Sequence, residues 1–173
     1  MMLWLLGALA LYAFCVVATG FFAGTETGMI SLNKPRLRHL AENGNRRAQR
    51  ILYWAQRQDT FIATTLIGTN LAIVTATAVI TAVGIELFGP YRGSLIATVT
   101  STVIVLIVAE VLPKAIFRQY ANRLMMELAG LFHASTVLLL PFSYVFSFVA
   151  KLIFRILNIT PPANKTGVGK DDL

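Results

Sequence analysis

The sequence predicts an all-α membrane protein with three transmembrane helices and further helices on the cytoplasmic side. Of its 173 residues, 56% are hydrophobic and 13% are charged, whereas soluble domains average roughly 45–50% and ~25%. Charged side chains are absent from residues 1–25, 60–85, 93–109 and 128–150. Each gap is close to or longer than the about 17–25 residues with which a helix crosses a bilayer. This pattern excludes an ordinary soluble domain and a disordered chain.

The distribution of basic residues predicts the orientation. We expect spans at about residues 3–30, 60–83 and 94–112. Seven of the fifteen basic residues lie between residues 31 and 59, so this stretch is predicted to be cytoplasmic and the N-terminus to lie outside. Gly89-Pro90 predicts a turn between the second and third spans. The same charge pattern predicts a cytoplasmic C-terminus, and the membrane is expected to be a bacterial or archaeal plasma membrane.

The polar stretch of about residues 34–58 carries apolar side chains near helical spacing. It predicts one or two amphipathic interfacial helices, broken near Asn43-Gly44-Asn45. The simpler interpretation of these helices is docking to lipid headgroups. The alternative is a role in gating.

A fourth apolar stretch predicts helices over about residues 118–158, kinked at Pro141, where a proline removes one helical hydrogen bond. Basic residues flank both ends of the stretch, which favours two helices that lie in the inner leaflet or re-enter it without crossing. A simple fourth crossing is the alternative. Residues 1–159 would then form the membrane domain, and residues 160–173, with two prolines and two glycines, a linker.

Glu110 and Asn70 lie within the apolar spans, where such groups are costly and usually functional. Glu110 precedes Pro113, which cannot donate a hydrogen bond to the carbonyl of Ala109, so a carboxylate and a freed carbonyl are predicted to lie close together. The alternative for Glu110 is a salt bridge to Lys114, four residues later. Asn70, in the second span, is either a ligand or a structural hydrogen-bonding group between helices.

Threonines accompany these two residues. Thr69 precedes Asn70, and Thr102 lies two helical turns before Glu110, on a partly polar face. A hydroxyl on either helix is a candidate ligand. Its alternative role is ordinary hydrogen bonding between helices.

The first span ends in a stripe of glycines, Gly20, Gly24 and Gly28. Small residues at this spacing let another helix approach closely. In the alternative interpretation they distort the helix and free carbonyls beside the hydroxyls of Thr25 and Thr27. Glu26 points elsewhere and is expected to pair with a basic interfacial residue.

All these groups are hard oxygen donors, which suit Mg²⁺, Ca²⁺ or Na⁺. His39, His133 and Cys15 are isolated in the sequence, so a soft transition-metal site is not predicted. No combination of residues predicts nucleophilic catalysis, and we do not expect an enzyme. The net charge of +7 comes from basic residues that flank apolar spans, so nucleic acid is not an expected partner.

Three ordered motifs carry a resemblance to a known family. The segment FFAGTETGMISLN (residues 21–33) resembles the opening of the membrane domain in CorC/cyclin-M (CNNM) magnesium transporters. LIGTNL (residues 66–71) resembles the family's LIGNNL motif, and AEVLPK (residues 109–114) its GEILPK motif. The resemblance implies Mg²⁺ export with possible Na⁺ coupling, a homodimer in the lipid bilayer, and a cytoplasmic CBS-pair module after the linker.

The ligand set expected from the motifs and the residue chemistry centres on Glu110. Asn70 and Thr25 would supply neutral oxygens, with backbone carbonyls near Gly24 and the hydroxyl of Thr69. Possible further contributors are Ala23, Thr27, Glu26 and Thr102. Compared with the family pattern, alanine replaces a serine at position 23, threonine a serine at 25 and threonine an asparagine at 69, so residue 23 offers only its carbonyl. The rival functions are a non-transporting membrane anchor or cation sensor, and a Mg²⁺ channel.

Overall fold

The computed structural model describes residues 2–156, with side chains through residue 142. Every secondary-structure element in this part of the chain is a helix. The elements are α1 (Met2–Ile30), α2 (Lys34–Glu42), α3 (Arg46–Ala55), α4 (Gln58–Phe88), α5 (Pro90–Ile104), η1 (Val105–Val111), α6 (Leu112–Gln119), α7 (Ala121–Glu127) and α8 (Ala129–Ile156). The linker expected at residues 160–173 lies outside the described residues.

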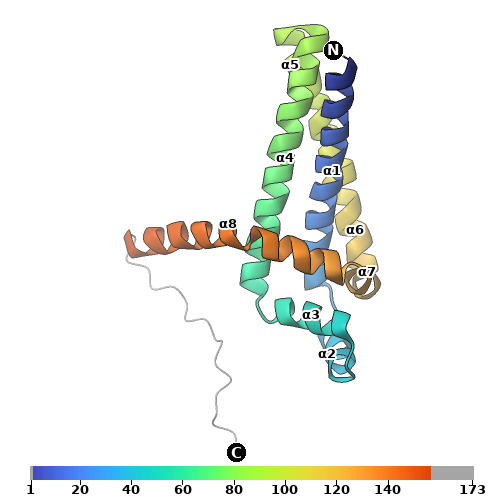
Figure 1. Cartoon of the computed structure of the whole chain (residues 1–173), viewed down its shortest axis with the longest axis vertical. Coiled ribbons are helices and arrows are strands. Elements are labelled where there is room, and N and C mark those ends of the chain that lie inside the picture. The colour runs from blue at the N-terminus through green and yellow to red at the C-terminus, as the bar shows by residue number, and fades with distance from the viewer. Residues whose placement is uncertain (1, 157–173) are drawn as a thin grey trace, which may run out of the picture.

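Three long helices form the body of the molecule: α1, α4, and the continuous run α5–η1–α6 (Figure 1). Each is long and apolar enough to cross a membrane, which confirms the predicted fold class of an integral membrane protein with three spans. The helices extend beyond the expected spans; α4, for example, covers Gln58–Phe88 where we expected about 60–83. A helix of 31 residues is about 46 Å long, enough for the hydrocarbon core and part of the headgroup region.

The turn between α4 and α5 is a single residue, Gly89, whose φ of 81° favours glycine. Residues 84–93, which separate the expected second and third spans, are therefore mostly helical. Gly84 and Gly93 meet backbone to backbone, because a Cβ atom on Gly93 would overlap the carbonyl oxygen of Gly84. These glycines let α4 and α5 pack closely as an antiparallel hairpin.

The glycine stripe of α1 packs against the third long helix and α7. A Cβ atom on Gly20 would lie 3.1 Å from Cγ of Pro113, and one on Gly24 only 2.5 Å from Cδ2 of Phe117. One on Gly28 would lie 2.9 Å from Sδ of Met125. The interpretation of these glycines as a close-packing face is confirmed.

Helices α2 and α3 lie at the end of the bundle where α1 ends and α4 begins (Figure 1). Their break falls at Asn43–Asn45, and Asn45 caps α3 by accepting hydrogen bonds from the backbone N–H groups of Arg47 and Ala48. Ile51 and Trp54 of α3 are buried in the core at this end. Burial of one face of α3 holds it across the bundle end.

Helix α8 runs across the three long helices rather than alongside them (Figure 1). The sharp bend in this region, 70°, separates α7 from the part of α8 that ends at Phe142. The prediction placed the kink at Pro141, but α8 continues through that residue. The bend lies at Leu128 because Ala129 and Phe132, both buried, anchor the start of α8 in the core, and packing sets the direction of the helix.

Candidate cation site

Glu110 lies in η1, a seven-residue π-helix in the middle of the third long helix. The backbone N–H of Leu112 donates to the carbonyl of Ile107, five residues earlier, as the wider π-helical turn requires. Pro113, which follows, has no N–H to donate to the preceding turn. Such turns are rare and frequently occur at functional sites, so the local backbone singles out Glu110.

The carboxylate of Glu110 accepts a hydrogen bond from Lys114 Nζ at 2.8 Å, and both side chains are 38% exposed. The salt bridge that the sequence offered as the alternative for Glu110 is therefore formed. A cation that binds this carboxylate must displace the ammonium group or share the carboxylate with it.

The backbone of α1 lies next to this π-helix. Gly20 faces the helix, since a Cβ atom there would lie 3.7 Å from the carbonyl oxygen of Ala109. Ala109 and Ala23 are both buried. Because no side chain projects from Gly20, the backbone of α1 comes close to the carbonyl oxygen of Ala109, the residue before Glu110.

The candidate hydroxyls all bond to their own helices. Thr25 Oγ1, which is fully buried, donates to the carbonyl of Phe21 at 2.8 Å. The hydroxyls of Thr27, Thr69 and Thr102 likewise donate to the carbonyls four residues earlier, at 3.2, 2.9 and 2.8 Å. A hydroxyl that donates its proton in this way keeps lone pairs that can accept a cation.

Asn70 lies on the outer face of α4. Its Nδ2 donates to the carbonyl of Leu66 at 2.8 Å, and the side chain is exposed. Gly68, which is packed against Phe22 of α1, lies about 200° around the helix from Asn70. The single chain therefore brings the α1 glycines to the helix of Glu110 but leaves the amide of Asn70 on the opposite side of α4.

The outer face of α4 around Asn70 is hollowed. A groove of about 590 Å³ is lined by Asn70 with Ala63, Leu66, Ile67, Leu71, Val74 and Phe142. Apart from Asn70 this lining is apolar. The amide oxygen of Asn70 is thus the side-chain acceptor that the groove offers.

Glu26 does not form the expected pair. Among residues 2–142, the ion pairs are Lys114–Glu110 and Arg123–Glu127. Glu26 is half-buried. In the same part of the chain, no group of three or more His, Cys, Asp and Glu residues is placed to hold a metal, so a site here depends on carbonyl, hydroxyl and amide oxygens around one carboxylate.

Two features of the site escaped the sequence interpretation. The first is the π-helix. Pro113 is the only residue in the sequence that points to it, and its missing N–H predicted a freed carbonyl but not a π-helical turn. The second is the ring of Phe117, which covers Gly24 and touches the position of a Cβ on Gly28. The ring fills the space between Gly24 and α6. The sequence did not predict this contact, because an aromatic residue in an apolar span does not show which neighbour it packs against.

The fold and this site define a class: a membrane domain of three spans, with a carboxylate in a π-helical turn of the third. Residues 10–173 match the family described as the cyclin M transmembrane N-terminal domain, CNNM. The chain belongs to this family.

Similar proteins come from several bacteria. The chain is 38% identical over 141 residues to the UPF0053 inner membrane protein YfjD of Escherichia coli K12. The aligned region covers 82% of the chain and 33% of that protein. It is 29% identical over 159 residues to a UPF0053 protein of Haemophilus influenzae, covering 92% of the chain and 38% of that protein. The chain spans about a third of the length of these relatives.

Proposed function

We propose that this domain transports Mg²⁺ out of the cell through a site whose negative charge is Glu110. Membership of the CNNM family supports a role in divalent-cation transport. The observation that carries the assignment is a carboxylate in a π-helical turn of a spanning helix, where the preceding residue, Ala109, packs against Gly20 of α1. Ionisable groups at such positions mark ion pathways.

One carboxylate is not enough for Mg²⁺, which takes near-octahedral oxygen ligands at about 2.0–2.1 Å and loses its water reluctantly. In this proposal the remaining ligands come from α1. They are the hydroxyl oxygen of Thr25 and backbone carbonyls at Ala23 and Gly24, with Thr27 as a further contributor. Na⁺ is the proposed coupling ion, since it prefers the same hard oxygen ligands.

Lys114 gives the site a way to release its cargo. Its ammonium group, 2.8 Å from the carboxylate of Glu110, competes with a cation for the same oxygens. Arrival of Mg²⁺ would move the ammonium away, and its return would weaken the ion's hold. Such competition suits a carrier, which has to release its ion, better than a permanent structural site.

Asn70 and Thr69 enter this proposal by one of two routes, because Asn70 faces away from α1 in the single chain. Rotation of α4 about its axis would bring both side chains toward the ion. Alternatively, a second copy of the chain in a homodimer would place the outer face of its α4 against the site. A disulfide between cysteines introduced at positions 70 and 110, in a Cys15→Ala background, distinguishes a bond within one chain from one between two.

The proposed orientation places α2, α3 and α8 on the cytoplasmic side, with the N-terminus outside. The seven basic residues between positions 31 and 59 support this orientation. Because α8 runs across the spans, we propose that it lies in the inner leaflet without crossing. The CBS-pair module that the resemblance implies would lie on the same side.

A second function, a membrane anchor or cation sensor that transports nothing, is favoured by the partners that the polar groups already have. Glu110 already has a partner, and the threonine hydroxyls are bonded to their own helices. In that case the polar groups only stabilise the bundle. A third function, a Mg²⁺ channel, predicts a conductance measurable in planar bilayers.

Flux into proteoliposomes that contain a Mg²⁺-sensitive dye separates these functions. A carrier predicts flux in the native chain and its loss in Glu110→Gln. The matched control is Glu127→Gln, which removes the other carboxylate paired at four residues' distance, to Arg123 at 2.9 Å, and should leave flux unchanged. No flux from the folded native chain would favour the anchor, and undiminished flux in Glu110→Gln would refute the assignment of the site.

A further inference from the structure

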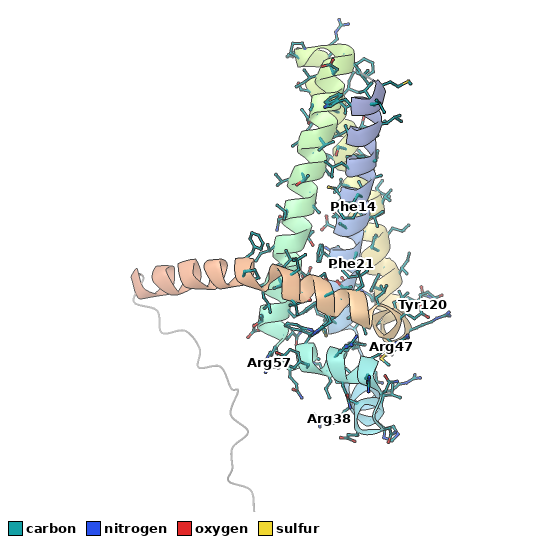
Figure 2. The ribbon with its side chains drawn as sticks, in the orientation of Figure 1. Phe14, Phe21, Arg38, Arg47, Arg57 and Tyr120 are labelled. Carbon is teal, nitrogen blue, oxygen red and sulfur yellow. The ribbon has the colours of Figure 1, made fainter. Side chains whose placement is uncertain are left out.

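A second site lies between α3 and the start of α8. A cavity of about 410 Å³ is lined by Arg46, Gln49, Arg50, Tyr53 and His133. Its lining residues belong to α3 and α8, and α3 and the start of α8 lie at the end of the bundle where α1 ends and α4 begins (Figure 1). Figure 2 shows Arg47 and Arg57, neighbours of these residues, at the same end. Because candidate spans end here, the cavity is at the level where lipid headgroups begin.

The charges of this cavity lack a carboxylate partner. Within residues 2–142, neither ion pair includes Arg46 or Arg50. Arg46 is the first residue of α3, and the first turn of α3 has no acidic residue. The helix dipole disfavours a cation at this end of a helix, so the charge of Arg46 is in an unfavourable position. An anion between these guanidinium groups would neutralise their charge. It would also offset the unfavourable position of a cation at the positive end of a helix.

The start of α8 adds to this positive potential. A Cβ atom on Gly130 would lie 3.7 Å from Nη1 of Arg50, so this guanidinium is next to the first turn of a 28-residue helix. The amino-terminal end of a helix carries a partial positive charge and favours anions. Arg46, Arg50 and the end of α8 therefore act together on one cavity.

Neutral donors complete the lining. Trp54 Nε1 is 3.0 Å from Nδ1 of His133, and an indole N–H only donates. Nδ1 therefore accepts, and His133 in this arrangement carries its proton on Nε2, which makes that nitrogen a donor. Tyr53, whose ring stacks on the guanidinium of Arg57 at 3.9 Å, supplies a phenolic hydroxyl.

We propose that this cavity binds the phosphate of an anionic diacyl phospholipid in the leaflet next to α3. Arg46 and Arg50 would hold the phosphate oxygens, and Tyr53 and His133 would donate hydrogen bonds to the headgroup. A soluble phosphate ester has the same chemistry, but the cavity's level favours a lipid. Val137, one turn after His133 on the same face of α8 and 46% exposed, offers apolar surface for an acyl chain. Basic pockets beside spanning helices are typical sites for anionic headgroups.

Native mass spectrometry of the detergent-purified chain, titrated with phosphatidylglycerol or phosphatidylcholine, tests the proposal. We expect tighter binding of phosphatidylglycerol. The double variant Arg46→Gln/Arg50→Gln should weaken it roughly tenfold or more, since each basic residue contributes about 1 kcal/mol. The control Arg38→Gln/Arg47→Gln removes the same charge from α2 and α3 outside the cavity lining and should leave the affinity within about twofold.

A second variant guards against misfolding of the first. Gly130→Glu places a carboxylate beside Arg50, in a first turn that favours an acidic residue, so the fold should persist and circular dichroism should show native helicity. Phosphatidylglycerol binding should be lost. Retention of binding in Gly130→Glu, equal weakening in the control pair, or glycerol phosphate binding as tightly as the lipid would each overturn the proposal.

Discussion

The ammonium group of Lys114 lies 2.8 Å from the carboxylate of Glu110, one helical turn away across the end of a π-helix. The pair sits in the region where the third long helix comes close to the glycines of α1. An exposed pair four residues apart contributes little to stability. Its importance is that the carboxylate proposed as the centre of the cation site already has a cationic partner, which would compete with the ion.

Removing that competitor should strengthen cation binding. We expect Lys114→Gln to raise the Mg²⁺ affinity about two- to fivefold, because a half-exposed pair contributes up to about 1 kcal/mol. Isothermal titration calorimetry of the purified chain measures the change. Arg123→Gln, which frees Glu127 in the same way, is the control and should not alter the affinity. A weaker affinity in Lys114→Gln would mean that the lysine helps to hold the site together.

The contact between Gly24 and Phe117 leaves no room for a methyl group. Gly24→Ala should lower the free energy of unfolding by about 1–3 kcal/mol, since the Phe117 ring must move. Gly7→Ala is the matched control in the same helix, because nothing lies within 4 Å of a Cβ at that position, and alanine there should be neutral or stabilising by up to about 1 kcal/mol. Thermal unfolding in detergent, followed by circular dichroism, compares the two. Equal stability would show that α1 does not pack on α6 as described.

Much of this fold could be predicted because its signals are local. Charge-free runs predict the spans, and glycines at four-residue spacing predict the face of α1 that packs on α6. The bend at Leu128 could not be predicted in this way, because it depends on the packing of Ala129 and Phe132 in the core, whereas Pro141 is only a local breaker.

The candidate site was less predictable than the fold. Glu110 stands out as a carboxylate in an apolar run, but a π-helix of seven residues has almost the same apolar pattern as an α-helix. The direction of Asn70 was hidden because α4 is apolar on nearly every face, with threonines interspersed, so its sequence does not show which face meets α1. The side-chain identities were therefore informative, and their directions were not.

The outward position of Asn70 allows its proposed role in transport to be tested separately from any role in folding. Asn70→Leu loses only a bond to the carbonyl of Leu66 in its own helix, so the unfolding temperature in detergent should hardly change. If the amide oxygen binds the cargo, proteoliposome flux should fall at least about tenfold, as expected for loss of a hydrogen-bonding or ion-binding group worth about 1.4 kcal/mol or more.

The control for Asn70→Leu is Thr75→Val, which removes a side chain bonded in the same manner, to the carbonyl of Leu71 at 2.8 Å. Its flux should match that of the native chain. Unchanged flux in Asn70→Leu would remove this residue from the ligand set and leave a site formed by Glu110 and α1.

The hydrogen bond from Trp54 to His133 joins α3 to α8 and offers a last test of how the bundle end is held. Trp54→Phe keeps most of the buried aromatic surface but leaves Nδ1 of His133 without its donor. We expect a loss of about 1–3 kcal/mol in the free energy of unfolding. Trp4→Phe, at a position that is 49% exposed in α1, should change it by less than about 0.5 kcal/mol.

Because the same bond places the proton of His133 on Nε2, Trp54→Phe should also weaken phosphatidylglycerol binding in the native mass spectrometry assay, whereas Trp4→Phe should not. A variant as stable as the native chain would show that α8 is held at the bundle end by Ala129 and Phe132 without help from this hydrogen bond.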